Sequence, residues 1–531
     1  MTELNDKPIE VLIIGAGPTG LMMACQLAIH HISFRIIDKN ESSSKNSGAL
    51  ILQARSLEIF EQMGIANEAI KQGIIPNKVN ILYDGKKITS SVIKNIGKNL
   101  SKFPFLLMLE QSKTEKILLK FISDRGISVE RNTCFKSFIQ DNDGVTSEVI
   151  LSNGLTQSIR SKYMIAADGA NSTIRNILNI PFSGKTYKKP IFILDCKAKT
   201  EMLDDEISIA FSKSYVAGFF PLQDFRWRID SNLPKELEKQ EKITFKDIQT
   251  DFPDWTKMNI AIQSDEWFSI TRSHQKYANT ICIKNCILAG DAAHVNTPVG
   301  AQGMNTGLQD SYNLAWKLAF VIKNKAKPEL LETYSTERLG ISKGFARYAD
   351  KVFKLVTSQN LVVKSLRAPL LKLLFKFLFP FIEKQNTFRQ KFFKSISQIG
   401  INYRKSSLSY QLSDGSFSKD APKVGDRLPY IQFLSKGKMV SIYEFLDPTY
   451  FNLLILANTL PDEISQIADN YHLKVSLIVQ QSETKELYKK LGINNSGYYL
   501  VQPDMYIAVR SDTMNTQYLN SYLQQFMQVN N

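Results

Sequence analysis

The regular pattern of the chain begins with a continuous apolar run at residues 9–14, IEVLII. Such a run is typical of a buried parallel strand. A glycine-rich turn follows, and residues 21–31 then place apolar side chains at helical spacing. A second apolar run, SFRIID, ends at Asp38. This order predicts a strand, a helix and a second strand, which is the repeating unit of an α/β sheet.

The pattern changes twice further along the chain. Residues 185–280 alternate apolar and polar positions in short segments such as EISIAFSK, which predicts a β-sheet. Residues 346–410 place apolar side chains every three or four positions, with Lys and Arg between them, which predicts helices. From about residue 421, the runs LLILAN and VSLIVQ predict parallel strands around a helix, and residues 498–510 predict a pair of strands.

The length of 531 residues predicts two to four domains, and an apolar content of 43% excludes a disordered chain. The formal net charge is +15, but residues 341–410 hold most of the excess. Two interpretations of these basic helices stay open: a surface over 346–395 that contacts an anionic membrane, or a helical cover packed on the rest of the protein. The segment carries no nucleic-acid-binding motif, so we expect no nucleic-acid partner.

The five Cys residues include no C-x-x-C pair, so we expect no disulfide framework. The five His residues show no compact ligand spacing, so we expect no protein metal site. No basic, apolar leader precedes the first strand and no apolar run is long enough to span a membrane. These features predict a cytoplasmic protein.

The turn after the first strand reads Gly15-Ala16-Gly17-Pro18-Thr19-Gly20. In a strand–helix–strand unit, the first glycine permits a tight turn, the second lets the backbone approach a pyrophosphate, and the third allows close packing of helix and strand. An acidic residue at the end of the second strand accepts hydrogen bonds from a ribose. We therefore expect a dinucleotide site that includes Gly15, Gly17, Pro18, Gly20, Asp38 and Lys39.

Two further segments place an aspartate after a strand. Asp168 follows residues 163–167, and an ordinary Asx turn is the alternative there. Asp291 follows the run CILAG, and its carboxylate can accept hydrogen bonds from a ribityl chain. The helix that begins near Gly303 directs backbone amides at an anionic group, such as the edge of a reduced flavin. We expect His294 to be structural rather than a base, because no neighbouring residue in the sequence orients it.

In their order, these three motifs resemble the single-component FAD monooxygenases of the p-hydroxybenzoate hydroxylase type. Residues 47–65, 103–118 and 330–342 resemble family segments too, although Gly48 and Ala301 depart from the usual residues. The resemblance implies an α/β fold: a Rossmann-type FAD-binding domain with an inserted β-sheet substrate domain. It adds several residues to the cofactor-binding set, which is then Gly15, Gly17, Pro18, Gly20, Asp38, Lys39, Arg55, Gln111, Asp168, Asp291, Gly300, Gly303, Met304 and Asn305.

Five parts are expected: an FAD-binding part at 1–184 with a short excursion near 78–100, a substrate sheet at 185–275, a second FAD-binding part at 276–345, basic helices at 346–415, and a terminal domain at 420–531. The terminal domain resembles the thioredoxin-like domain of the phenol and polyketide hydroxylase branches, from which Gln502 and Met505 depart. No Cys follows Cys286, so a dithiol redox role is excluded.

The resemblance implies that noncovalent FAD, NADH or NADPH, and O₂ support hydroxylation of an aromatic, phenolic or polyketide-like molecule by a monomer or homodimer. Candidates for the base that activates the substrate are Tyr187, Tyr215 and Asp195, and the Pro298 carbonyl is placed beside the flavin. Phe219, Phe220 and Pro298 are candidate substrate contacts, with a plain core as the alternative for the two aromatic residues. Arg226 and Arg228 meet either an anionic substrate or solvent. A quinone-reducing flavoprotein and a flavin-binding sensor are the rival functions.

Overall fold

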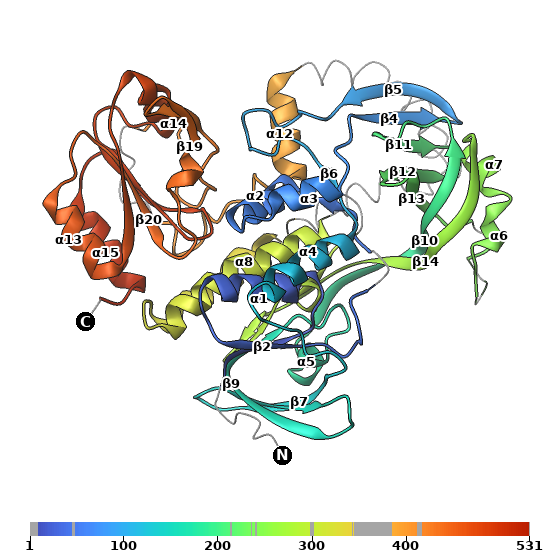
Figure 1. The fold of residues 1–531 in the computed structure, drawn as a ribbon, viewed down its shortest axis with the longest axis horizontal. Coiled ribbons are helices and arrows are strands. Elements are labelled where there is room, and N and C mark those ends of the chain that lie inside the picture. The colour runs from blue at the N-terminus through green and yellow to red at the C-terminus, as the bar shows by residue number, and fades with distance from the viewer. Residues whose placement is uncertain are drawn as a thin grey trace.

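The computed structural model describes residues 9–44, 48–212, 215–234, 236–238, 240, 242–297, 302–341, 344, 385–410 and 417–529. Three large sheets organise the described residues, and they contain seven, eight and four strands. Figure 1 shows the first sheet at the bottom, the second at the upper right and the third at the left, with α1 and α8 between them. The α/β fold expected from the sequence is therefore present.

The first sheet has the order β15-β16-β9-β1-β2, and β7 and β8 extend it beside β9. Its strands are β1 (Ile9–Ile14), β2 (Phe34–Ile37), β7 (Cys134–Gln140), β8 (Val145–Ile150), β9 (Thr156–Ala166), β15 (Cys282–Ile283) and β16 (Cys286–Leu288). β1 runs parallel to both β2 and β9, and β16 runs parallel to β9. The predicted strand–helix–strand unit is confirmed, because α1 (Pro18–Ile29) joins β1 to β2.

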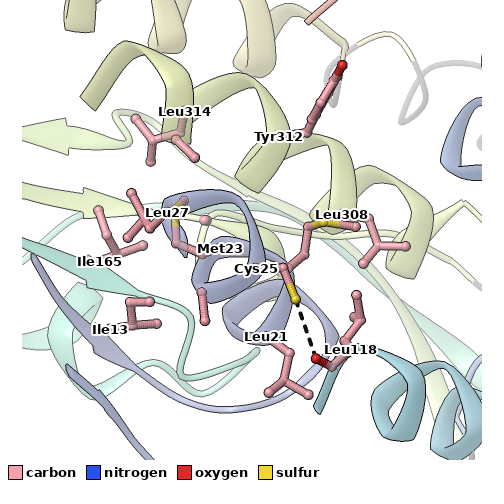
Figure 2. Close-up of a cluster of buried hydrophobic side chains, with 14 of the residues drawn as sticks. Ile13, Leu21, Met23, Cys25, Leu27, Leu118, Ile165, Leu308, Tyr312 and Leu314 are labelled. Atoms are coloured by element: carbon pink, nitrogen blue, oxygen red, sulfur yellow. Dashed lines mark hydrogen bonds between the residues drawn. The ribbon is translucent and has the colours of Figure 1, made fainter. Parts of the chain in front are cut away.

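Helix α1 packs between the first sheet and two further helices, α4 (Gln111–Ser123) and α8 (Gly303–Ile322). Figure 2 shows Leu21, Met23 and Leu27 of α1 among Ile13, Ile165, Leu308 and Leu314. The Cys25 thiol donates a hydrogen bond of 3.4 Å to the carbonyl of Leu118 on α4. Residues on every side of α1 are therefore buried, which fixes its N-terminus relative to the sheet.

The second sheet has the order β17-β14-β10-β13-β12-β11-β4-β5. Its strands are β4 (Lys78–Tyr83), β5 (Lys86–Val92), β10 (Phe182–Thr200), β11 (Glu206–Phe211), β12 (Val216–Leu222), β13 (Arg226–Asn232), β14 (Ile260–Ala278) and β17 (His294–Val295). Two short helices, α6 (Lys246–Gln249) and α7 (Phe252–Thr256), cover one face. Figure 1 shows these helices on the side of β10 and β14 away from the first sheet, and we call that face the outer face.

The third sheet has the order β21-β20-β22-β23, with β20 parallel to β21 and the other pairs antiparallel. The elements of this C-terminal domain are β18 (Gln432–Ser435), β19 (Lys438–Ser441), β20 (Phe451–Leu456), α13 (Asp462–Tyr471), β21 (Leu473–Ile478), α14 (Lys485–Leu491), β22 (Gly497–Val501), β23 (Ile507–Ser511) and α15 (Thr516–Phe526). Trp316 and Phe320 of α8 enter its core, where their rings lie 5.5 and 5.7 Å from the ring of Phe451.

The remaining elements connect these layers. They are β3 (Ile51–Leu52), α2 (Ala54–Gln62), α3 (Ala66–Gln72), β6 (Leu107–Met108), α5 (Thr173–Ile177), a helix over 332–341, α12 (Asn386–Ile396) and the 3₁₀ turns η1 (Gly290–Ala292), η2 (Pro328–Leu331), η4 (Ile442–Phe445) and η5 (Ser482–Thr484). Most of the basic segment, residues 345–384, lies outside the described residues. No helix in the described part of the chain has the length and apolar character needed to cross a membrane.

Candidate functional site

The three sequence motifs follow three adjacent strands of the first sheet. The glycine turn follows β1, Asp168 follows β9, and Asp291 lies in η1 after β16. Because these strands are parallel neighbours, their carboxyl ends lie at one edge of the sheet. Open α/β sheets bind ligands at this edge. The structure therefore brings the predicted cofactor motifs to one place.

The three glycines of the turn have different physical reasons to be glycine. Gly15 adopts a φ of +103°, and a Cβ there would lie 2.3 Å from the Ala167 carbonyl oxygen. A Cβ on Gly20 would lie 1.9 Å from the Gly15 carbonyl oxygen. A Cβ on Gly17, in contrast, meets no atom within 4 Å. Protein packing explains the first and third glycines, whereas Gly17 leaves the backbone at the N-terminus of α1 accessible, as a pyrophosphate requires.

Asp38 stands one residue after β2 and holds the glycine turn. Its Oδ2 accepts a hydrogen bond of 2.7 Å from the Ala16 amide, and Oδ1 accepts one of 2.8 Å from the Asn40 amide. Arg131 lies 3.8 Å from Oδ2. Pro18 begins α1, and Lys39, the residue after Asp38, is exposed. The carboxylate is thus fixed in place at the edge where a ribose would lie.

Asp168 lies four residues before Ser172, the N-cap residue of the short helix α5, and binds the first amides of that helix. Its Oδ2 accepts hydrogen bonds from the amides of Thr173, at 2.8 Å, and Ile174, at 3.4 Å. Its Oδ1 is buried without a hydrogen-bond partner among the described residues. These bonds reach five and six residues along the chain, so they are not those of an Asx turn, and the second oxygen remains available to a ligand donor. Arg175 of α5 joins the two aspartate motifs, because it donates to the Ala292 carbonyl at 3.0 Å.

The Asp291 side chain is accessible to solvent, yet the protein around it raises the pKa of its carboxyl by desolvation. The nearby Asp310 raises this pKa further, and His294 lowers it. An accessible carboxylate at the end of a parallel strand fits a partner that donates hydrogen bonds, such as a ribityl hydroxyl.

The expectation that no group orients His294 is wrong. Its Nε2 lies 2.7 Å from Oδ2 of Asp310 on α8, and Arg338 donates to Oδ1 of the same carboxylate at 2.6 Å. The Gly290 amide donates to Oδ2 at 3.0 Å. We call His294, Asp310 and Arg338 the α8 charge cluster. All three side chains are buried.

The α8 charge cluster depends on residues that the sequence analysis missed. Burial would raise the pKa of the Asp310 carboxyl, but His294 and Arg338 outweigh it and hold the pKa at about 2. Arg338 also donates to the hydroxyl of Tyr403 at 3.0 Å. The three residues are far apart in the chain, so no short motif joins them. The sequence signal was one charged residue, Asp310, on the buried face of a long apolar helix.

Several other predicted cofactor residues serve as connections within the protein. The Asn305 amide accepts from the Gln53 amide at 2.9 Å and donates to the Ile51 carbonyl at 2.7 Å. Gln111 begins α4 and accepts from the Ala49 amide at 3.0 Å. Gly303 and Met304 begin α8, and Met304 packs against the core of the first sheet. Pro298, Gly300 and Ala301 lie outside the described residues.

Arg55 faces the C-terminal domain. It donates to the Asp504 carbonyl at 2.7 Å and pairs with Glu58 at 3.2 Å. Its guanidinium lies over the rings of Tyr312 and Tyr506, at 5.6 and 5.4 Å from their centres. The Arg55 side chain is thus bound to groups of the C-terminal domain and of its own helix, and its role in cofactor binding stays a prediction.

The face of the second sheet opposite the outer face is directed at the FAD-binding half, and we call it the inner face. Arg226 on β13 donates to both oxygens of Glu110, each at 3.0 Å, and Glu110 immediately precedes Gln111. Arg228 donates to both oxygens of Asp195 at 2.6 and 2.7 Å. Arg228 is 1% exposed, so the expectation of a solvated strand face is wrong.

The candidate substrate residues lie on different faces of the second sheet. Phe219 is buried in the outer core, 6.1 Å from the ring of Phe252, so its prediction as a substrate contact is wrong. Tyr215 stacks on Trp255 of α7, with ring centres 5.4 Å apart, and burial raises its pKa. Phe220 lies on the inner face and packs with Leu50 and Met108. Tyr187 is half-buried in β10.

No group of three or more His, Cys, Asp or Glu side chains in the described ranges is arranged to hold a metal ion. The candidate site is therefore built from backbone amides, separated carboxylates and the inner face of the second sheet.

Comparison with known proteins adds an independent line of evidence. Residues 8–349 match the family model described as FAD binding domain. The chain is 26% identical to 6-methylpretetramide 4-monooxygenase of Streptomyces rimosus, over 97% of this chain and 93% of that one. It is 26% identical to pentachlorophenol 4-monooxygenase of Sphingobium chlorophenolicum, over 94% and 93%. The flavin-dependent monooxygenase PieE, solved with FAD and substrate, has the same fold, with a TM-score of 0.80 and 19% identity over 98% of this chain and 99% of that one.

Proposed function

The chain belongs to the FAD binding domain family, and from this premise we propose that it is an FAD-dependent monooxygenase that hydroxylates an aromatic or polyketide-like small molecule. One observation carries the proposal: the glycine turn, Asp168 and Asp291 follow β1, β9 and β16, which are adjacent and parallel. A dinucleotide cofactor is long enough to contact all three.

The residues at this edge fit FAD. The accessible backbone at Gly17 and the N-terminus of α1 suit the pyrophosphate, and Asp38 suits the adenosine ribose. Asp291 suits the ribityl chain, and the unpartnered oxygen of Asp168 can accept a further hydrogen bond. When bound, FAD supplies the oxidation chemistry, with NADH or NADPH as reductant and O₂ as the oxygen donor.

The protein's own contribution is to bind, orient and exclude water. The α8 charge cluster fixes the turn that carries Asp291, because Asp310 accepts from the Gly290 amide and pairs with His294. Arg226 and Glu110 join the second sheet to the start of α4. We propose that the substrate lies against the inner face, where Phe220 offers an aromatic contact.

The C-terminal domain is proposed to be thioredoxin-like. Its sheet order β21-β20-β22-β23, with one parallel pair followed by two antiparallel pairs, supports this assignment. A structural role fits it, because Arg427 of this domain pairs with Glu58 of α2 at 3.0 Å.

The test is oxygen incorporation. The FAD-loaded protein is supplied with NADH or NADPH, ¹⁸O₂ and a panel of phenols and polycyclic aromatic ketones, and products are analysed by mass. We expect at least one compound to stimulate NAD(P)H oxidation and to gain one labelled oxygen atom. Reduction of a quinone without incorporation of labelled oxygen would instead identify a flavin oxidoreductase. Absence of bound flavin would refute the proposal.

A further inference from the structure

The inner face of the second sheet carries a carboxylate that the sequence analysis did not select. Asp230 follows Arg228 by two residues on β13, so both side chains lie on the same face. Arg226 precedes Arg228 by two residues and lies on the same face. Its hydrogen bond to Glu110 shows that this face is directed at the FAD-binding half. Successive side chains on one face are about 7 Å apart. Asp230 is therefore one step further along the same row.

Asp195 and Asp230 differ in their partners. Both oxygens of Asp195 accept hydrogen bonds from the buried guanidinium of Arg228. Oδ1 of Asp230 is buried and has no hydrogen-bond partner among the described residues. A carboxylate whose two oxygens are both held by one arginine has no oxygen left for a substrate, whereas an unpartnered oxygen can accept a hydrogen bond or a proton. Asp195 is thus a poor candidate for the activating base.

The surroundings of Asp230 suit a phenol. Directly opposite it on β12 is Gly218, which has no side chain. A Cβ on Gly218 would lie 2.7 Å from the ring of Phe220, so this ring extends over Gly218. Residues directly opposite in an antiparallel pair are about 5 Å apart. An aromatic ring and an unpartnered carboxyl therefore lie side by side on the inner face.

We propose that Asp230 binds the phenolic hydroxyl of the substrate and accepts its proton before hydroxylation. In this step the substrate O–H bond breaks, the proton passes to a carboxylate oxygen of Asp230, and the electron pair stays on the substrate oxygen. The resulting phenolate makes the ring more electron-rich and hence more reactive toward an electrophilic oxygen. The inference rests on the proposed function and adds the catalytic base to it.

The charges around Asp230 are compatible with this role. The pKa of Asp230 is raised to about 6, because burial, with a smaller contribution from Asp195 on β10, outweighs the opposite effect of Arg228 on its own strand. The facing residues Gly218 on β12 and Ile193 on β10 are uncharged. Asp230 is therefore ionised at neutral pH but less acidic than an ordinary aspartate, as a general base requires.

The other two candidate bases, Tyr215 and Tyr187, do not share the position of Asp230 on the inner face beside the Phe220 ring. Tyr215 stacks on α7 at the outer face. Tyr187 lies where the pairing of β10 with β14 is irregular, between Thr186 and Pro190. Neither residue combines an unpartnered oxygen with an adjacent substrate-side ring in the described structure.

The test compares two phenols in FAD-loaded wild type, Asp230→Asn and Asp204→Asn. Unsubstituted phenol has a pKa of about 10 and must lose its proton on the enzyme. The second probe, 4-nitrophenol at pH 9, is already ionised in solution. Asp204 is an exposed aspartate in the turn before β11, so its variant is the matched control.

We expect Asp230→Asn to slow ¹⁸O incorporation into phenol by about 100-fold or more, which is typical of a lost general base. Incorporation into 4-nitrophenol should fall less than about threefold, and Asp204→Asn should resemble wild type with both probes. The difference spectrum of 4-nitrophenol bound near pH 6 gives a readout independent of turnover: its hydrogen bond to the Asp230 carboxylate should shift the absorption band to longer wavelength with wild type, and less with Asp230→Asn.

Three outcomes decide the matter. Equal labelling of phenol by wild type and Asp230→Asn would overturn the inference and leave the monooxygenase proposal intact. Equal slowing with both probes would assign Asp230 a purely structural role. Absence of label from both phenols with wild type would contradict the premise that a phenol is the substrate class, and with it the inference.

Discussion

Two groups of buried charge differ in how completely the oxygens of their carboxylates are paired. In the α8 charge cluster, both oxygens of Asp310 accept hydrogen bonds, from Arg338 and from the Gly290 amide and His294. In the sheet charge cluster, which we define as Asp195, Arg228 and Asp230, Asp230 keeps an unpartnered buried oxygen. Burying an unpaired charge costs free energy. The difference indicates that the first cluster supports the fold, whereas the second retains a strain that substrate binding can relieve.

The largest expected effect comes from breaking the paired cluster. Arg338→Met leaves Asp310 buried with an incomplete set of partners, and removal of one partner of a buried pair typically lowers the free energy of unfolding by about 3–5 kcal/mol. Arg404→Met is the matched control, because Arg404 pairs with Asp426 at 2.7 Å but is 49% exposed. We expect the control to cost less than about 1 kcal/mol in urea denaturation. If both variants lowered the free energy of unfolding equally, the distinction between the buried and the exposed ion pair would be wrong.

The next effect is the acid dependence of the wild type. The pKa of Asp310 is lowered from 3.8 to about 2 in the folded protein. Its contribution to stability is therefore present above about pH 4 and is lost as the pH falls toward 2. This corresponds to about 2 kcal/mol. Asp310→Asn should remove this part of the acid dependence in denaturation curves between pH 2 and 5, and an unchanged slope would contradict the assignment.

Asp230 should show the opposite sign. Its pKa is raised from 3.8 to about 6, so the ionised form destabilises the folded state, and the loss of stability develops as the pH rises from about 4 to 6. We expect Asp230→Asn to raise the free energy of unfolding by up to about 3 kcal/mol above pH 6 and to change nothing below pH 4. Asp204→Asn serves as the control. Destabilisation by Asp230→Asn at pH 7 would mean that the carboxylate is paired after all.

The smallest effect on stability is expected at Gly218. A Cβ there would lie 2.7 Å from the Phe220 ring, so Gly218→Ala must displace the ring from its position beside Asp230. We expect phenol affinity to fall about tenfold, or about 1.4 kcal/mol, with little change in melting temperature. Gly340→Ala, where a Cβ meets no atom within 4 Å, is the control. Unchanged affinity in Gly218→Ala would place the phenol elsewhere on the sheet.

The parts of the site that were predictable from the sequence are those set by neighbours along the chain. The glycine turn between β1 and α1, the position of Asp38 after β2 and the helix after Asp168 depend on local backbone geometry and on short spacing. The α/β fold follows from the same periodicities.

The missed parts depend on strand register and on distant contacts. Phe219 and Phe220 are adjacent in sequence, yet a strand directs them to opposite faces, and only the packing of α6 and α7 decides which face is the core. Asp195 was a candidate base because the sequence does not show that Arg228 pairs with it from the neighbouring strand. The contact of His294 with Asp310 required the fold of α8 onto η1.

Helix α8 belongs to two cores at once, and this limits how the protein can be divided or recombined. Leu308 and Leu314 pack on the first sheet, whereas Trp316 and Phe320 pack inside the C-terminal domain. A fragment that ends at residue 349, where the family match stops, would present two large aromatic side chains to water. Exchange of terminal domains between relatives therefore succeeds only if the incoming domain carries a surface complementary to Trp316 and Phe320, so that helix and domain must be inherited, or engineered, as a matched pair.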